Sequence, residues 1–300
     1  MPSGATAPAI GPTAPATFSP NHDGASDTAR LAWTSSEAIT GTARVYRGTT
    51  LVRSWPIVGG RSGAVTWTGT NSAGAPVADG SYTFRVTGRE AAGNLTVRTA
   101  VVKVDRTLST LRWSAPAFYP QDGDRIAASS KVTFSTARSA TVSAAIYAGS
   151  TLIRTIWTNR ALGAGSHAWS WDGRNNAGAV VARGTYVLKV TATSAIGTSS
   201  LTRSVVADAF TTTVSSGAVA AGQTLTVTVA TTEALRTSPT IAFTQPGKAA
   251  VRKTAVSLGG GRYRASFVVA AGAAGTASIA ISGRDTAGGL NTSSRTVAVR

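Results

Sequence analysis

The sequence predicts an all-β chain of three tandem β-sandwich domains. The first observation behind this prediction is an internal repeat: "WTGTNSAGAPVADGSY" (Trp67–Tyr82) returns as "WDGRNNAGAVVARGTY" (Trp171–Tyr186), about 100 residues further along the chain. The second is the hydrophobic pattern, in which short runs alternate apolar and polar residues and end at turns that contain Gly. Such runs indicate the strands of a sandwich, and no segment has a convincing helical period.

Residues 1–16 are expected to form a linker, because Pro, Ala and Thr dominate "MPSGATAPAIGPTAPA". This segment has neither the basic region nor the apolar region of a signal peptide, so no signal peptide is expected in this chain. We expect that the chain is a fragment of an exported protein whose export signal lay upstream or was removed.

Residues 17–106 are predicted to form the first domain. "ARVYRG" and "TLVRSW" stand on either side of a short turn that contains Gly, which is the pattern of a β-hairpin. "SYTFRVTG" alternates strictly, so its side chains point in turn to opposite faces of a sheet. "TVRTAVVKV" is expected to close the domain as its last strand.

Residues 107–207 are predicted to repeat the first domain. "IYAGSTLIR" (Ile146–Arg154) matches "VYRGTTLVR" (Val45–Arg53), and "FYP" at 118–120 matches "FSP" at 18–20. Together with the Trp-to-Tyr segment, these make three landmarks in the same order. A shared order of landmarks indicates a duplicated domain.

Residues 208–300 are predicted to form a third, divergent sandwich. "QTLTVTVAT", "RYRASFVVA" and "TASIAISGRD" alternate in the manner of strands, but all seven Trp precede this part of the chain. The segment Val104–Ala117, which joins the first two domains, has few flexible residues. We therefore expect a fairly stiff joint between them.

Composition excludes several classes of protein. Cys is absent, which removes disulfides, thiolate metal sites and cysteine nucleophiles. The chain has no run of 18 apolar residues, so no membrane span is expected.

The net charge of +17 points to anionic partners. The charge is spread over all three domains, and a basic surface attracts polyanions. An anionic cell-wall polymer or polysaccharide is therefore an expected partner, although the charge can equally serve solubility alone. The Arg residues alternate along strands and accompany no nucleic-acid-binding motif, so sequence-specific nucleic-acid recognition is not expected.

Two segments resemble motifs of one protein family. "FSPNHDGASDT" (Phe18–Thr28) is similar to an F-S-P-N-x-D-G-x-x-D opening, and Trp171–Tyr186 is similar to a W-D-G hairpin, of bacterial Ig-like domains related to that of the flagellar hook-cap protein. "VDRT" resembles the joint between tandem copies, and the resemblance covers residues 17–207. It implies Ig-like sandwiches of the kind that serve exported proteins as spacers, adhesive modules or attachments to secreted hydrolases. Residues 208–300 resemble other bacterial Ig-like domains in general pattern only, and with them we expect three tandem Ig-like β-sandwich domains in an elongated array.

Oxygen-bearing side chains stand close together near the start of the first domain. Asn21, Asp23 and Asp27 form an N-x-D-G-x-x-D loop, and hard cations such as Ca²⁺ bind several oxygens from loops of this kind. The alternative is an Asx-turn, in which these side chains accept backbone N–H groups. Calcium is thus the one candidate cofactor. In the second copy, Asp122 and Asp124 match this pattern less completely.

The repeat distinguishes structural residues from variable ones. Charges are not kept, because Asp172, Arg174 and Arg183 have uncharged or oppositely charged counterparts in the first copy. We therefore interpret the Trp-to-Tyr segment as a structural hairpin. The residues that both copies share at its ends and last turn are assigned structural roles: Trp67, Gly80, Tyr82, Trp171, Gly184 and Tyr186.

Two further tryptophans, Trp157 and Trp169, are open to two interpretations. An exposed indole can stack on a sugar ring, which makes these residues candidates for ligand binding. The alternative is that they enlarge a core that has no disulfide to stabilise it.

Catalysis is not expected from this chain. It holds only 12 acids and no G-x-S-x-G motif. We therefore expect a non-catalytic extracellular array, a structural or adhesive module of a bacterial cell-surface protein whose partners are its parent protein or neighbouring subunits. One alternative is the targeting module of a secreted polysaccharide- or peptidoglycan-acting enzyme. Another is a subunit of an extracellular appendage or filament, in which edge strands pair between subunits.

Overall fold

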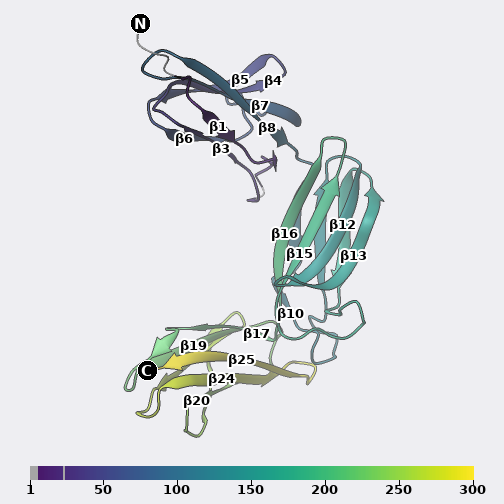
Figure 1. The fold of residues 1–300 in the computed structure, drawn as a ribbon. Coiled ribbons are helices and arrows are strands. Elements are labelled where there is room, and N and C mark those ends of the chain that lie inside the picture. Colours follow the sequence, from purple (N-terminus) through teal and green to yellow (C-terminus); the bar gives the residue numbers. More distant parts are fainter. Residues whose placement is uncertain (1–5, 23) are drawn as a thin grey trace.

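The computed structural model describes residues 6–22 and 24–300 as three β-sandwiches in series (Figure 1). Every regular element of the described residues is a strand, which confirms the predicted all-β fold class. The array is curved, because both outer domains lean to the same side of the middle domain (Figure 1).

The first domain packs a three-stranded sheet, β1-β3-β6, against a five-stranded sheet, β2-β8-β7-β4-β5. Residues 10–13, which the sequence assigned to the linker, form β1, because Ile10 is buried in the core and the strand completes the smaller sheet. The strands of this domain are β1 (Ile10–Thr13), β2 (Thr17–Phe18), β3 (Ala29–Ser35), β4 (Thr40–Arg47), β5 (Thr50–Val58), β6 (Ser62–Trp67), β7 (Gly80–Arg89) and β8 (Leu95–Val104).

The second domain repeats this architecture strand for strand, with sheets β14-β11-β9 and β10-β16-β15-β12-β13. The segment expected to join the two copies contains β9, the counterpart of β1. The strands are β9 (Leu108–Trp113), β10 (Ala117–Phe118), β11 (Ser130–Thr136), β12 (Ala140–Ala148), β13 (Thr151–Leu162), β14 (Gly165–Trp171), β15 (Gly184–Thr193) and β16 (Thr198–Ala207).

The third domain is a related sandwich with sheets β17-β19-β23-β22 and β18-β25-β24-β20-β21. Its short parallel pair β18–β25 corresponds to β2–β8 and β10–β16. Phe243 and Phe267 take the place of Trp in its core, with ring centroids 5.6 Å apart. The strands are β17 (Phe210–Val214), β18 (Ala218–Val219), β19 (Thr224–Thr231), β20 (Thr240–Thr244), β21 (Val251–Thr254), β22 (Val256–Gly259), β23 (Arg262–Val268), β24 (Gly275–Arg284) and β25 (Leu290–Val299).

The repeated Trp-to-Tyr segment is held by the same bonds in both copies. In the first copy, the indole N–H of Trp67 donates to the carbonyl of Thr70 at 2.9 Å, and the hydroxyl of Tyr82 donates to the carbonyl of Ala78 at 2.5 Å. Equivalent bonds recur in the second copy. The four aromatic residues assigned structural roles are buried and the two glycines begin β7 and β15: Trp67, Tyr82, Trp171 and Tyr186, with Gly80 and Gly184.

A glycine in this hairpin explains the Phe-x-Pro landmark. Gly69 has φ +70°, and a Cβ atom at this residue would lie 2.6 Å from Cγ of Pro20. Gly173, with φ +71°, stands against Pro120 in the same way, and a Cβ atom there would overlap the proline ring. The proline therefore packs directly on a glycine whose replacement would bring both a clash and an unfavourable backbone conformation.

Candidate functional site

The loop predicted to bind calcium lies between β2 and β3, beside the second domain. The carboxylate of Asp27 accepts backbone N–H bonds from Asn21 at 3.1 Å, His22 at 2.6 Å and Gly24 at 2.8 Å. The amide of Asn21 donates to the carbonyl of Leu108 at 3.1 Å, which ties the loop to β9. Asp23 lies outside the described residues, and calcium binding at this loop stays a prediction.

The first joint, between the first and second domains, is held by a compact set of ion pairs. Asp79 precedes β7, and its two carboxylate oxygens contact Arg106 at 2.6 Å and Arg138 at 2.7 Å. Arg138 belongs to the second domain and also contacts Asp105 of the first at 3.6 Å. Burial alone would raise the pKa of the Asp79 carboxyl, but hydrogen bonds from Arg138 and Arg106 outweigh burial and hold its pKa below the ordinary value. Two carboxylates and two guanidiniums thus balance at this joint.

The second joint, between the second and third domains, gathers carboxylates instead. Asp122 and Asp124, from the loop between β10 and β11, meet Glu233, which follows β19. Oxygen atoms of these three residues lie within 4.8 Å of one another. Asp285, which follows β24, and Asn291 of β25 complete the group. We call Asp122, Asp124, Glu233, Asp285 and Asn291 together the acidic cluster.

Each side chain of the acidic cluster forms a local hydrogen bond through one oxygen or, in Asn291, through the amide nitrogen. Oδ1 of Asp285 accepts hydrogen bonds from backbone N–H groups of the β24–β25 loop, and Asn291 Nδ2 donates to Glu233 Oε2 at 2.7 Å. In each member, however, one buried oxygen has no hydrogen-bond partner among the described residues. These atoms are Asp122 Oδ2, Asp124 Oδ2, Glu233 Oε1, Asp285 Oδ2 and Asn291 Oδ1.

Burial and mutual repulsion raise the pKa values of carboxyl groups in the acidic cluster. Burial is the main cause that raises the pKa of Glu233 to about 7; the hydrogen bond from Asn291 opposes this rise, and repulsion from Asp122, Asp124 and Asp285 adds to it. Burial also raises the pKa of Asp122, with repulsion from Asp124 and Asp285 added. Among the ion pairs of the described residues, none involves these four carboxylates. Oxygen ligands without a neighbouring cation are the donor set that a hard metal ion prefers.

Sequence reasoning identified Asp122 and Asp124 but missed their partners. Glu233, Asp285 and Asn291 come from two segments of the third domain that are more than 50 residues apart. One signal was available: residues 208–300 contain only three acids, Asp208, Glu233 and Asp285, and all three lie at this joint. Clustering of scarce acids in a basic chain indicates a site.

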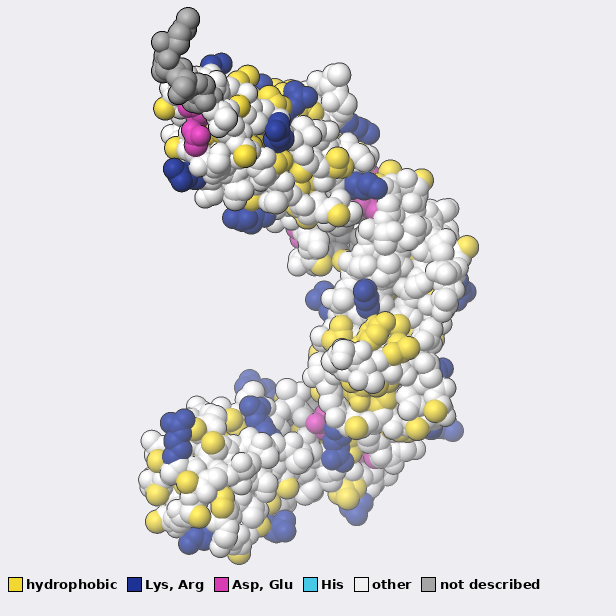
Figure 2. Space-filling view, in the orientation of Figure 1, with side chains coloured by type: hydrophobic (Ala, Val, Ile, Leu, Met, Phe, Trp, Pro, Cys, Tyr) yellow, Lys and Arg dark blue, Asp and Glu magenta, His cyan; other side chains and the backbone are white. Residues whose placement is uncertain are grey.

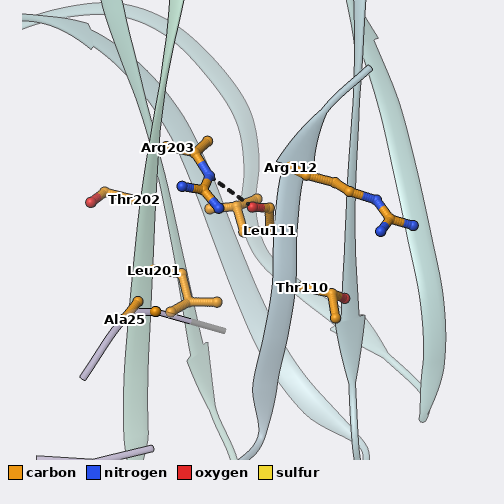
Figure 3. Close-up of a pocket in the computed structure, with 8 residues that line it drawn as sticks. Ala25, Thr110, Leu111, Arg112, Leu201, Thr202 and Arg203 are labelled. Atoms are coloured by element: carbon orange, nitrogen blue, oxygen red, sulfur yellow. Dashed lines mark hydrogen bonds between the residues drawn. The ribbon is translucent and has the colours of Figure 1, made fainter. Parts of the chain in front are cut away.

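A cleft of about 200 Å³ lies at the first joint, between the loop after β2 and strands β9 and β16. Arg203 Nε donates to the carbonyl of Leu111 at 3.1 Å across its wall, whereas Arg112 points away (Figure 3). The cleft is lined by Gly24, Ala25, Thr110, Leu111, Arg112, Leu201, Thr202 and Arg203. This lining contains neither a carboxylate nor His, so it assembles no acid–base pair.

Trp157 and Trp169 lie on different sheets, in β13 and β14. Both are half-buried and pack against the core of the second domain. The ring of Trp157 contacts Phe134, with centroids 5.8 Å apart, and the Arg160 guanidinium lies 5.0 Å from the Trp157 ring centroid. Ligand binding by the two tryptophans stays a prediction.

Comparison with known families bears on the middle of the chain. Residues 123–195 match the family model of the FlgD Ig-like domain. The middle domain is thus similar to FlgD Ig-like domains over these residues. The match covers the repeated hairpin from Trp171 to Tyr186, so the resemblance predicted from that hairpin is confirmed there. The first domain has the same strand order and the same hairpin bonds as the middle domain.

Solved structures that match the chain include parts of bacterial adhesins. One concerns host cell surface retention of a 1.5-MDa bacterial ice-binding adhesin, with 14% identity, a TM-score of 0.25 and coverage of 99% of each chain. Another is a tetra-tandem repeat in the extending region of a large adhesion protein, with 16% identity, a TM-score of 0.25 and coverage of 98% of this chain and 75% of that one. A mutant of Salmonella alpha-2-macroglobulin has 12% identity and a TM-score of 0.31, covering 97% of this chain and 23% of that one.

No curated protein sequence matches the chain. Within residues 6–22 and 24–300, no helix has the length and apolar character needed to cross a membrane.

Proposed function

We propose that the chain is a non-catalytic spacer of an exported bacterial protein, in which Ig-like sandwiches are held at fixed angles. The observation that carries this proposal is the ion pair between Asp79 and Arg138, which joins two domains directly. The connections are also short: three residues separate β8 from β9 and two separate β16 from β17. Segments this short allow little rotation between the domains, so the array keeps its shape. A rigid array fixes the distance between the cell surface and the part of the parent protein that it carries.

Small-angle scattering of the full chain tests the spacer proposal. We expect a monodisperse monomer whose scattering profile fits the curved array of Figure 1. A flexible distribution of shapes would contradict the spacer role. Mass that grows with concentration would favour the appendage alternative, in which edge strands pair between subunits.

We further propose an anionic cell-wall polymer or polysaccharide as a partner of the spacer. Lys and Arg side chains are spread over all three domains on the face seen in Figure 2, which favours broad contact with a polyanion. Binding to purified walls should be strong at low salt and fall steeply as salt releases the electrostatic contact. Binding that ignores salt would favour the targeting-module alternative, with a ligand recognised by the aromatic residues Trp157 and Trp169.

A further inference from the structure

We propose that the acidic cluster binds one Ca²⁺ ion and thereby ties the second domain to the third. The ligands are divided between the domains: Asp122 and Asp124 come from one, and the other three members come from the next. The binding inference rests on the cluster alone, whereas its mechanical consequence rests on the proposed spacer function.

The unpartnered oxygens are the observation that points to an ion. Asp285 and Asn291 are fully buried and Glu233 is 3% exposed, yet each has an oxygen without a hydrogen-bond partner among the described residues. A buried polar atom left unpaired costs about 1–3 kcal/mol, and more when it is charged. Several such atoms in one place would be strongly unfavourable, unless a cation joins them.

The backbone leaves space between these oxygens. A Cβ atom on Gly289 would overlap Oδ2 of Asp285 and lie 2.9 Å from Oδ2 of Asp122. The two carboxylates thus approach the same point from different domains, and glycine keeps that point open. Any larger residue at 289 would occupy the space into which both oxygens project.

The donor set selects the class of ion. The five unpartnered atoms are all oxygens, four from carboxylates and one from a carboxamide. Ca²⁺ accepts six to eight oxygen ligands in flexible geometry, whereas Zn²⁺ prefers nitrogen and sulfur, and Mg²⁺ keeps several of its waters. Carboxylates from three separate loops suit the flexible geometry of Ca²⁺. Water or the second carboxylate oxygens would complete the coordination.

Calorimetric titration of the chelator-treated full chain with CaCl₂ tests the proposal. We expect one equivalent to bind at the acidic cluster, with affinity weakened roughly tenfold or more in Glu233→Gln and in Asp285→Asn. The matched control is Asp172→Asn, because Asp172 is an exposed acid of the second domain, and its affinity should equal that of the wild type. Asp23→Asn separates this site from the predicted loop site and should also leave this affinity unchanged.

The decisive outcomes are separable. No heat of binding, or unchanged affinity in both Glu233→Gln and Asp285→Asn, would overturn the site. Gly289→Ala keeps every ligand and should weaken binding by filling the space, which guards against variants that simply fail to fold. Circular dichroism of each variant without calcium checks the fold. Binding that leaves the distribution of distances between the second and third domains unchanged would keep the site but contradict its proposed role in tying these domains together.

Discussion

The two joints of this chain occupy equivalent places, but residues at equivalent positions of the two joints carry opposite charges. Arg138 is the second residue after β11 and contacts Asp79 across the first joint, whereas the second residue after β19 is Glu233. Asp79 precedes β7, and the residue that precedes β15 is Arg183. Both positions of the first joint's ion pair are thus reversed in sign at the second.

The residues of opposite charge at the second joint, Arg183 and Glu233, do not pair with each other. Arg183 turns to Thr292 and to the ring of Tyr119, whose centroid lies 5.9 Å from the guanidinium. Glu233 instead joins Asp122 and the other acids of the cluster. The comparison teaches that one sandwich architecture accommodates two kinds of joint: one neutralised by its own arginines, and one that leaves its charge for a cation to neutralise.

Converting the second joint to the charge of the first should have the largest effect. Glu233→Arg places a guanidinium among the remaining acids, which removes a ligand and supplies the missing positive charge. At free Ca²⁺ about 100 times Kd, the wild type should gain about 2.7 kcal/mol from the ion by mass action, and the variant should gain nothing. Thermal unfolding with and without CaCl₂ measures this. If the variant keeps the calcium-dependent rise in Tm, the second joint does not depend on a cation held by Glu233.

Reversing the charge of the first joint should have a smaller effect. Arg138→Glu leaves Asp79 and Asp105 without the guanidinium that links them across the joint. Because the Arg138 side chain is about a third exposed, we expect a loss of about 1–2 kcal/mol, less than for a fully buried pair. Denaturant unfolding measures the loss. Arg138→Lys keeps the charge but not the forked contacts, so its free energy of unfolding should lie between those of the wild type and Arg138→Glu.

Acid should weaken the first joint through Asp79. Its pKa is lowered in the folded chain, so the carboxylate contributes stability above its ordinary pKa of 3.8, and this contribution is lost as pH falls through the lower folded value. Unfolding of the wild type below about pH 4 should therefore be steeper in pH than that of Asp79→Asn. Identical pH profiles would show that the ion pairs do not stabilise the joint.

The exposed charges of the second hairpin should have the smallest effect. Asp172 and Arg174 form a 3.7 Å pair with both side chains at least half exposed. Replacing both with the Thr residues of the first copy should change the free energy of unfolding by no more than about 0.5 kcal/mol. Urea unfolding is sufficient to measure this, and a loss near that expected for Arg138→Glu would mean that the hairpin depends on its charges.

The fold was predictable because its signals are local. Alternating runs mark the strands, and the duplicated hairpin reports the repeat through residues such as Trp67 and Trp171, whose burial is the same in both copies. β1 was missed because "IGPT" at 10–13 has the Pro content of a linker, and only pairing with β3 makes it a strand.

The second joint was predictable only in part, because its residues are far apart in the sequence. Asp122 and Asp124 were visible as a pair, but Asp285 meets them only when the third domain docks. Variation between the repeats was also misleading. The difference between Asp79 and Arg183 suggested a dispensable charge, whereas the structure places both at joints that differ in chemistry.

Spin-label distances between domains show whether the two joints are held by different means, one by ion pairs and the other by a bound cation. The chain has no Cys, so cysteines introduced at the exposed positions Val58, Leu152 and Val256 carry one spin label per domain, used in pairs. We predict that CaCl₂ narrows the distance distribution between the second and third domains and leaves that between the first and second unchanged. A response at both joints, or at neither, would contradict the account.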